Sequence, residues 1–399
     1  MTENEAALII QQAFKRYMKK KTDRYGLYRQ YVPLMNGIEL LFTDSKNELY
    51  TLNMNRISKS ALGPEKKVYL TDNSLFYAER ESILIFGGSD PHTGYGVGKH
   101  TGKEIFRYVP HQNQWEFVGE LPEPRQHHSV VFMKGRVYLV GGTDPRDDDV
   151  RGKAIVVDTV WSFEPVKRSW FSEGSLNTPR KHFGLIVHKN QLFAIGGQDR
   201  QYKTLDSVEK FDSKRGNWTL VAPMQYTRTG LACTKYRGVV WAAGGISLLP
   251  KGNKILDVVE SYNIDSDQWT EITRLRYPRC FFKMFVMYDR LYLVGGAGFE
   301  TKKDPTTTSL GAIDVWDVKK LKWLNVAEMV IPRHGHSVAF IGTQFMIIGG
   351  VTTIYMRALN NAECFCVRRG RWVRGVAPLQ LPVSGHAAVT LPPAMLISR

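Results

Sequence analysis

Six Gly-Gly pairs, each at the end of a short apolar run, recur along the chain at nearly constant spacing. They begin at Gly87, Gly141, Gly196, Gly244, Gly295 and Gly349, so that successive pairs are 54, 55, 48, 51 and 54 residues apart. The apolar runs, such as Val-Tyr-Leu-Val before Gly141, are typical of buried strands. A period of about 50 residues restricts the chain to folds that repeat one unit, because each unit needs a neighbour to cover its apolar face.

A second fixed feature follows each Gly-Gly pair. A tryptophan lies 22–29 residues beyond the first glycine, and another aromatic residue precedes that tryptophan by seven residues in every copy. The pairs are Tyr108/Trp115, Phe163/Trp170, Phe211/Trp218, Tyr262/Trp269, Trp316/Trp323 and Phe365/Trp372. The constant step predicts a hairpin, whereas the variable interval before it predicts a loop. Large aromatic side chains at one repeated position are expected to pack between successive units.

After five of the six tryptophans, a Pro-Arg pair or a near match opens the next unit. These pairs are Pro124-Arg125, Pro179-Arg180, Thr227-Arg228, Pro278-Arg279 and Pro332-Arg333. The order of a strand, a strand ending in Gly-Gly, a strand with an aromatic residue and a strand opened by Trp resembles the kelch repeat. Six complete copies cover residues 75–378. The resemblance implies an all-β fold, a β-propeller of four-stranded blades.

The flanks of the six copies resemble two halves of one more repeat. Residues 38–54 keep the seven-residue step at Phe42 and Leu49, and residues 382–389 resemble residues 332–338, with His386 aligned to His336. Pairing the two flanks would give a seventh blade and would leave no exposed strand edge. We therefore expect seven blades, with a ring of six blades and flanks packed outside as the alternative.

The domain bounds, the numbers of charged residues and cysteines and the lack of long apolar runs lead to expectations about partners and cell compartment. We expect a basic helical segment and linker at residues 1–30 and a propeller at residues 31–399. The 54 Lys and Arg exceed the 38 Asp and Glu by 16, which favours an acidic partner: a protein surface, a nucleic acid or a lipid surface. No apolar run approaches membrane-spanning length, and the N-terminus has no secretory pattern, so we expect a cytoplasmic protein. Four cysteines are too few for a disulfide framework.

The charge is expected to be divided between the two faces of the ring. Tight turns join strands one to two and three to four on one face, and these turns carry 18 basic and 10 acidic residues. The longer loops on the other face, including residues 89–103 and 297–312, carry 12 basic and 14 acidic residues. The alternative is that the turns are charged only for solubility. The basic positions singled out are Lys134, Arg136, Lys167, Arg168, Lys214, Arg215, Lys235, Arg237, Lys319, Lys320, Lys322, Arg368, Arg369 and Arg371.

Residues 6–21 have apolar side chains at helical spacing, with Lys and Arg toward the C-terminal end. The segment resembles an IQ motif, and the resemblance implies binding of calmodulin or a related EF-hand protein. Arg16 stands where that family usually has Gly, a change that is commoner where binding requires calcium. The alternatives are a helix docked on the propeller or lying on a membrane. The calmodulin-binding residues would be Ile10, Gln11, Phe14, Lys15, Tyr17, Met18 and Lys20.

Catalysis is not expected. Propellers of this kind include a copper radical oxidase, but His128, His336 and His386 occupy the position where kelch repeats commonly carry a structural histidine. His127 and His182 lie at equivalent offsets after their arginines, within possible reach of the central channel. The chain has no phosphate-binding loop, no metal-ligand motif and no recognisable catalytic triad. We expect no cofactor and no metal.

These features favour a non-enzymatic scaffold that docks on an acidic macromolecular surface, such as a cytoskeletal or ciliary polymer. The N-terminal helix would recruit calmodulin or a related EF-hand protein. One alternative is a substrate receptor of a ubiquitin ligase, a frequent role of kelch propellers. Another is a nucleic-acid-associated assembly protein, which rests on net charge alone. The sequence does not identify the ligand of the propeller, because one fold serves many functions.

Overall fold

The computed structural model describes residues 39–43, 49–53, 81–92, 101–148, 152–164, 169–213, 215–249, 252–299 and 307–392. The regular elements in these ranges are all β-strands, as the repeat predicted. None of the described residues belongs to a helix with the length and apolarity needed to cross a bilayer. The calmodulin-binding residues predicted at positions 10–20 lie outside the described residues.

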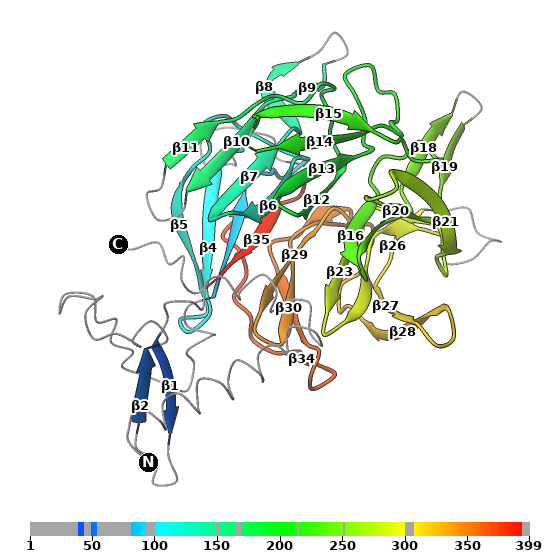
Figure 1. Cartoon of the computed structure of the whole chain (residues 1–399). Helices are drawn as coiled ribbons and strands as arrows, with labels where there is room; N and C mark the ends of the chain where they lie inside the picture. Colours follow the sequence, from blue (N-terminus) through cyan, green and yellow to red (C-terminus); the bar gives the residue numbers. More distant parts are fainter. Residues whose placement is uncertain are drawn as a thin grey trace, which may run out of the picture.

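Six four-stranded antiparallel sheets, the blades, are arranged in a ring (Figure 1). Blade 1 contains β35 (Ala387–Leu391), β3 (Ser82–Phe86), β4 (Glu104–Val109) and β5 (Gln114–Glu120). Blade 2 contains β6 (Ser129–Met133), β7 (Arg136–Val140), β10 (Val160–Glu164) and β11 (Ser169–Ser172). Blade 3 contains β12 (Gly184–His188), β13 (Gln191–Ile195), β14 (Val208–Asp212) and β15 (Asn217–Val221).

The other three blades follow in chain order. Blade 4 contains β16 (Ala232–Tyr236), β17 (Val239–Ala243), β20 (Val258–Asn263) and β21 (Gln268–Arg274). Blade 5 contains β23 (Lys283–Met287), β24 (Arg290–Val294), β27 (Ala312–Asp317) and β28 (Lys322–Glu328). Blade 6 contains β29 (Ser337–Ile341), β30 (Gln344–Ile348), β33 (Ala362–Cys366) and β34 (Arg371–Val373).

Short strands between the second and third strands of a blade form hairpins on the long-loop face. They are β8 (Thr143–Asp148) with β9 (Ala154–Val156), β18 (Ile246–Leu249) with β19 (Gly252–Ile255), and β31 (Val351–Thr352) with β32 (Arg357–Ala358). A small sheet joins β22 (Arg279–Cys280), β25 (Ala297–Gly298) and β26 (Thr308–Ser309). Near the N-terminus, β1 (Glu39–Thr43) pairs with β2 (Leu49–Asn53).

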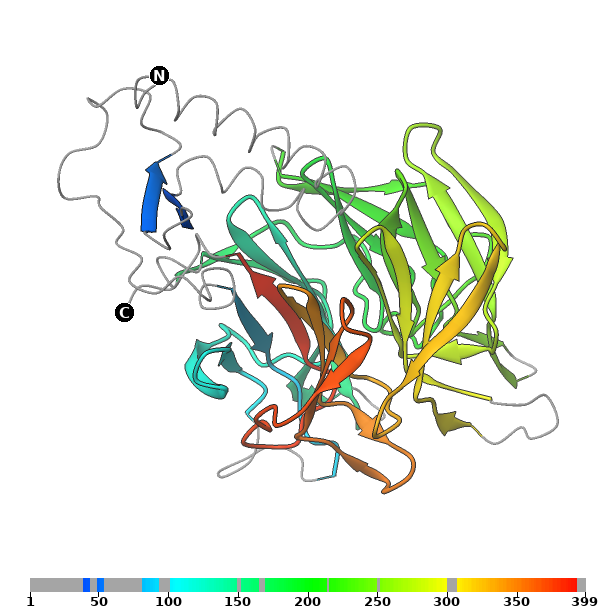
Figure 2. The ribbon, with the colours of Figure 1, turned by 90° about the horizontal axis from the view of Figure 1, so that it is seen from below.

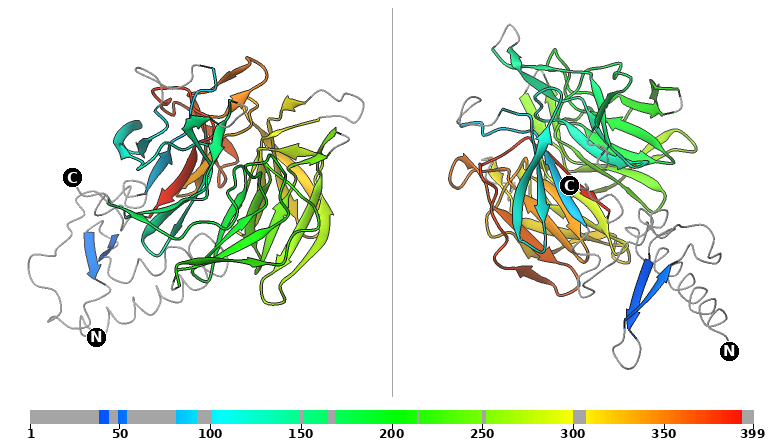
Figure 3. Two further views of the ribbon diagram at one scale, coloured as in Figure 1. Left: turned by 90° about the horizontal axis from the view of Figure 1, so that it is seen from above. Right: turned by 90° about the vertical axis from the view of Figure 1, so that its left-hand side faces the viewer.

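The ring closes at blade 1, where the two ends of the described repeat region meet. Strand β35 pairs along its whole length with β3, from Ser82↔Leu391 to Phe86↔Ala387. The two strands lie side by side in Figure 2 and Figure 3, where the red β35 adjoins the blue β3. The innermost strand β35 also contacts its neighbours β6 and β29. The two ends of the described repeat region are thus joined within one sheet, which leaves β3 with no open inner edge.

The expectation of a seventh, split blade is wrong in one particular. The C-terminal flank does supply an innermost strand, but its partner is the first repeat and not residues 38–54, and β1 pairs only with β2 among the described strands. The described residues therefore give a ring of six blades, the alternative considered from the sequence. Among the described strands, β35 occupies the inner position beside β3 and so completes the first blade.

The apolar core is divided into six clusters, one at each junction between neighbouring blades. The cluster around Trp241 and Leu293, for example, joins blades 4 and 5, and that around Ile83 and Ile348 joins blades 6 and 1. Each repeated aromatic residue faces its tryptophan directly across the third and fourth strands, as in Phe211↔Trp218. The indole N–H of Trp218 donates to the carbonyl of Gly174 in the preceding blade, at 2.9 Å. The expected packing of these aromatics between units is confirmed.

The Gly-Gly pairs are required by close backbone contacts. Gly141 and Gly142 have φ values of +55° and +93°, which L-residues with a side chain rarely adopt. A Cβ atom on Gly141 would lie 2.6 Å from the carbonyl oxygen of Arg180, in the segment that opens the next blade. The glycines therefore let the loop that enters the next blade lie directly on the end of the second strand.

The repeated arginines are fully buried and bind acidic residues that the sequence analysis did not single out. In blade 4, Arg228 donates to Glu260 at 2.5 Å and to the carbonyls of Gly244 and Val258. Equivalent pairs are Arg180–Glu209 at 2.5 Å in blade 3, Arg279–Asp314 at 2.6 Å in blade 5, and Arg333–Glu363 in blade 6. Each acid lies two residues before the repeated aromatic, which is the sequence signal that could have identified it.

Candidate interaction surface

The described basic positions that were predicted from the sequence lie in the tight turns or within two residues of them. Lys134 and Arg237 adopt positive φ in two-residue turns between the first two strands of blades 2 and 4, each followed by glycine. The turns between third and fourth strands carry Arg215 in blade 3, Lys319 and Lys320 in blade 5, and Arg368 and Arg369 in blade 6. Lys167, Arg168 and Lys214 lie outside the described residues.

On blades 2 to 5, basic side chains in or beside these turns contact neighbouring polar or acidic groups. Between blades 3 and 4, Lys189 Nζ lies 3.5 Å from Asp265 Oδ1. Between blades 4 and 5, Arg237 Nη2 lies 3.9 Å from Asp289 Oδ2. Arg136 lies 3.7 Å from both Glu164 and Glu173 and covers the ring of Phe171. These pairs are exposed, so each contributes little to stability. They do cancel much of the local charge, so the predicted basic face is not uniform.

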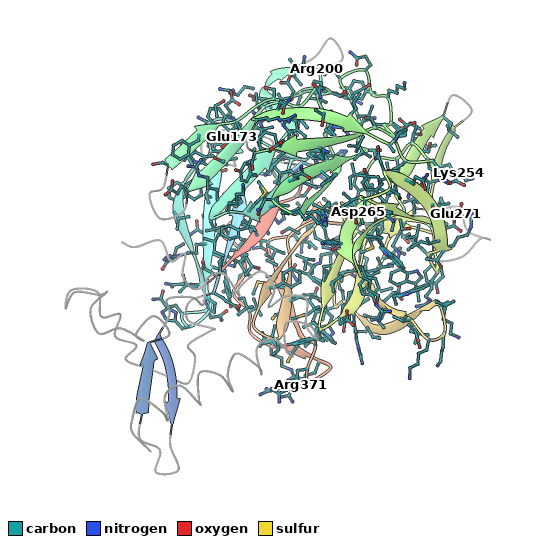
Figure 4. All side chains as sticks on the ribbon, in the orientation of Figure 1. Glu173, Arg200, Lys254, Asp265, Glu271 and Arg371 are labelled. Carbon is teal, nitrogen blue, oxygen red and sulfur yellow. The ribbon has the colours of Figure 1, made fainter. Side chains whose placement is uncertain are left out.

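Blade 6 differs because the arginines in and after its turn between the third and fourth strands form no ion pair among the described residues. Four arginines lie within seven residues: Arg368, Arg369, Arg371 and Arg374. None of them forms an ion pair with an acid of the described chain, by contrast with blades 2 to 5. Arg374 was not singled out from the sequence, because it lies beyond the turn that was tallied. Figure 4 shows Arg371 at the outer rim of the molecule, beside β34.

The same arginines border two adjoining hollows in the surface of blade 6. One, of about 540 Å³, is lined by Thr343, Gln344, Cys366, Arg368 and Arg369. The other, of about 580 Å³, shares Gln344, Cys366 and Arg369 with the first and is also lined by Arg371, Trp372, Val373 and Arg374. Hydrogen bonds hold two of the lining residues: Gln344 accepts from Cys364 at 3.0 Å, and the Trp372 indole donates to the Glu328 carbonyl at 3.1 Å. Volumes of this size accommodate several side chains of a binding partner.

The described ranges show neither a cluster of metal ligands nor an activated thiol among Cys233, Cys280 and Cys364. No group of three or more His, Cys, Asp or Glu residues in these ranges could hold a metal ion. All four cysteines are free thiols, and burial raises the pKa of Cys233, Cys280 and Cys364 to about 12. Thiols with such pKa values are poor nucleophiles near neutral pH. The buried rings of His128 and His336 have pKa values well below the usual range, since burial disfavours the imidazolium.

The junction between blades 1 and 6 contains an acidic group with an unusual pKa. Glu81, just before β3, accepts a hydrogen bond from the N–H of Gly342 in the first turn of blade 6. Burial nevertheless raises the pKa of this carboxyl to about 7. Nearby, Asn113 donates to the carbonyl of Gly375 at 2.6 Å and accepts from the N–H of Ala377 at 2.9 Å. Polar contacts thus supplement the apolar cluster at this junction.

Known proteins share this architecture. Residues 92–357, more than half of the chain, match the family model of the Attractin/LZTR1 β-propeller. A solved structure described as "Structure of YjhT" superposes with a TM-score of 0.59 at 16% identity, covering 72% of this chain and 97% of that chain. At that level of identity the superposition supports the fold alone.

Among curated proteins, alpha-scruin from Limulus polyphemus is 31% identical over 320 residues, which cover 79% of this chain and 34% of that protein. Kelch-like protein 15 from Danio rerio is 26% identical over 255 residues, which cover 59% of this chain and 40% of that protein. Kelch-like protein 36 from Mus musculus is 26% identical over 314 residues, with coverage of 77% and 48%. The chain spans a third to a half of these relatives' length. On this evidence the chain belongs to the Attractin/LZTR1 β-propeller family, and its blades are kelch repeats.

Proposed function

We propose that this propeller is a non-enzymatic interaction scaffold that docks on an acidic protein surface through blade 6. The observation that supports this most directly is the group of Arg368, Arg369, Arg371 and Arg374 around the hollows, without acidic partners in the described chain. Guanidinium groups bind carboxylates in pairs of parallel hydrogen bonds, and four of them on a rigid edge suit a partner with closely spaced Asp and Glu.

A cytoskeletal polymer is the partner class we favour, because such a filament repeats an acidic surface and multiplies weak contacts. The test is co-sedimentation of the purified chain with actin filaments and, separately, with microtubules. We expect binding to one of them that falls at least tenfold when Arg368, Arg369 and Arg371 are changed to Ala together. Binding should also weaken as salt rises, because exposed charges are screened.

The matched control changes basic residues of the same face that already have acidic partners. Lys189→Ala combined with Arg237→Ala removes two cations near Asp265 and Asp289 and should leave binding within about twofold. If both variants lose affinity for the polymer equally, binding depends on the net charge of the protein and not on the arginines of blade 6. Absence of binding to both polymers would reject the cytoskeletal proposal. Binding to polynucleotide that is lost in the same triple variant would favour nucleic-acid association instead.

The N-terminal segment supports a second proposal, which rests on sequence alone. The Ile10-Gln11 pair with Phe14, Lys15 and Lys20 would recruit calmodulin or a related EF-hand protein. The test is a calmodulin pull-down with and without calcium, comparing the intact chain with one lacking residues 1–24. We expect binding that is lost on truncation, and binding that survives truncation would assign the contact to another part of the chain.

A further inference from the structure

A collar of equivalent residues surrounds the axis of the ring at one end of the innermost strands. We call each buried pair of a repeated arginine and its acid, such as Arg228–Glu260, a clamp. The six members of the collar each lie two residues after the repeated arginine or the residue in its place: His127, His182, Gly230, Phe281, Gly335 and Gly385. All six have positive φ, between +53° and +66°. Their backbones form a chain of hydrogen bonds across blades, as in Gly230 N–H to His182 O at 2.8 Å and Phe281 N–H to Gly230 O at 2.7 Å.

The collar combines large rings with glycines that make room for them. The rings of His127 and His182 have centroids 4.2 Å apart, and His182 lies 5.0 Å from Phe281. A Cβ atom on Gly385 would lie 2.8 Å from the ring of His127, and one on Gly230 would lie 2.8 Å from the ring of Phe281. The glycines therefore allow two imidazoles and a phenyl ring to occupy the axis, and these rings are only partly buried.

Next to the collar, one lysine occupies a position that small residues fill in every other blade. Lys283 opens β23 and pairs with Val294, the residue before a Gly-Gly pair. The residues at the equivalent register in the other blades are Ser129, Gly184, Ala232, Ser337 and Ala387. The Lys283 side chain is exposed although it starts from an innermost strand. Solvent therefore reaches the axis at this level, and Lys283 is the long side chain that extends into it.

The electrostatic surroundings of Lys283 are cationic or neutral. Desolvation by the surrounding blades lowers the pKa of Lys283, and the nearby Cys233 opposes that shift. The charge of Lys283 in turn helps to lower the pKa values of His128, His182 and His336, so groups of four other blades lie around it. The other charge acting on the collar histidines His127 and His182 is that of Lys181. No carboxylate of the described residues forms an ion pair with Lys283. An ammonium group that faces the solvent of the channel between several blades, and that has no ion-pair partner among the described residues, favours a bound anion.

We propose that the axial channel binds a small free oxyanion, with the Lys283 ammonium as its counter-charge and the His127 and His182 rings at its entrance. The ligand class is a compact tetrahedral or carboxylate anion, because one ammonium group beside two imidazole rings matches a single small anionic group. This site is separate from the arginines of blade 6 and does not depend on the proposed docking function.

The test is calorimetric titration of the intact chain with inorganic phosphate, sulfate and acetate, with sodium chloride at matched ionic strength as reference. We expect saturable phosphate binding that Lys283→Met weakens at least tenfold and that Lys283→Arg largely retains. The control Lys320→Met, in an exposed turn of blade 5, should bind as the parent does. Unchanged binding by Lys283→Met, or no anion binding by the parent chain, would overturn the proposal.

A second measurement decides the case even where Lys283→Met does not fold. Phosphate added to the unmodified chain should shift the side-chain NMR resonances of His127 and His182 in a saturable way. Chloride at equal ionic strength should leave them unchanged. Shifts confined to histidines away from the axis, such as His111 and His188, would place the anion elsewhere and would reject the site.

Discussion

Blades 3 to 6 and blade 1 have the same fold but join their first and third strands with different chemistry. In blades 3 to 6 a buried arginine at the entrance binds an acid on the third strand, as in Arg228–Glu260. In blade 1 the same two positions are Val383, which is buried, and Phe106, which is half-buried, and both belong to one apolar cluster. Blade 2 is intermediate: Arg125 binds Glu123 and lies 3.5 Å from Asp144, and Trp161 replaces the acid.

This difference shows that the ion pair is not required to form a blade. A buried ion pair often contributes no more to stability than an apolar pair, since desolvation of both charges offsets their attraction. Removing only one partner of the ion pair is costly, however, because the other charge then remains buried and unpaired. The acids also hold the loop that enters the blade: Glu209 accepts N–H groups of Asn177 and Thr178, and Glu363 those of Val330 and Ile331. Blade 1 instead depends on a strand from the far end of the repeat region.

The largest expected effect follows from removing that strand. A chain ending at residue 378 lacks β35, so blade 1 loses the partner of Ser82–Phe86 and β6 loses a neighbour. We expect loss of most of the roughly 5–15 kcal/mol that stabilises a folded domain, seen as a broad and early urea transition. A chain ending at residue 392 keeps β35 and should unfold as the full chain does. Equal stability of the two would contradict closure through β35.

The next effect in size comes from removing one partner of a buried arginine–acid pair. Arg228→Met leaves Glu260 fully buried without its guanidinium and should cost about 3–5 kcal/mol in chemical unfolding. Adding Glu260→Gln keeps an acceptor for the N–H of Gln225 and should recover at least half of that loss. A single variant that loses under about 1 kcal/mol would show that the blade tolerates the unpaired acid.

The junction of blades 1 and 6 should respond to pH through Glu81. Its pKa of about 7 in the folded protein exceeds the ordinary 4.5, so the folded protein binds the proton more tightly. Stability from this group is full below pH 4.5 and is lost as pH rises toward 7. Glu81→Gln, which keeps an acceptor for Gly342, should therefore stabilise the chain by about 1–3 kcal/mol at pH 8 and have little effect at pH 4.5. Unfolding curves at the two pH values measure this, and an equal effect at both would rule out the titration.

The smallest expected effect comes from transferring the clamp to blade 1. Val383→Arg alone and Phe106→Glu alone should each destabilise, because each places a charge in an apolar cluster. The double variant should be more stable than the sum of the single effects predicts, by about 1 kcal/mol. A double-mutant cycle from urea unfolding gives this coupling. Strict additivity would mean that the backbone of blade 1 does not bring the two positions together.

The sequence predicted those parts of the fold that depend on local spacing. The hairpin from Phe211 to Trp218 and the close contacts of Gly141 follow from residue types at fixed distances along the chain. The closure was mispredicted because pairing of β35 with β3 is a long-range choice between two candidate edges, which no local pattern distinguishes. The uneven charge of the tight-turn face was missed for a related reason. Whether the charge of Lys189 is neutralised depends on its distance from Asp265 in the next blade. Counting the charged residues of the turns in the sequence gives no such distance.

The pairing of β3 with β35 also has a consequence for biosynthesis. Residues 82–86 leave the ribosome long before residues 387–391, so the inner edge of β3 must remain without its native partner while the other blades are made. An unpaired apolar strand is a site for wrong pairing with another nascent chain. Blades 2 to 6 need no such wait, because all four strands of each are contiguous in the sequence. Translation speed and chaperone supply should therefore govern the yield of native protein through blade 1 more than through any other blade.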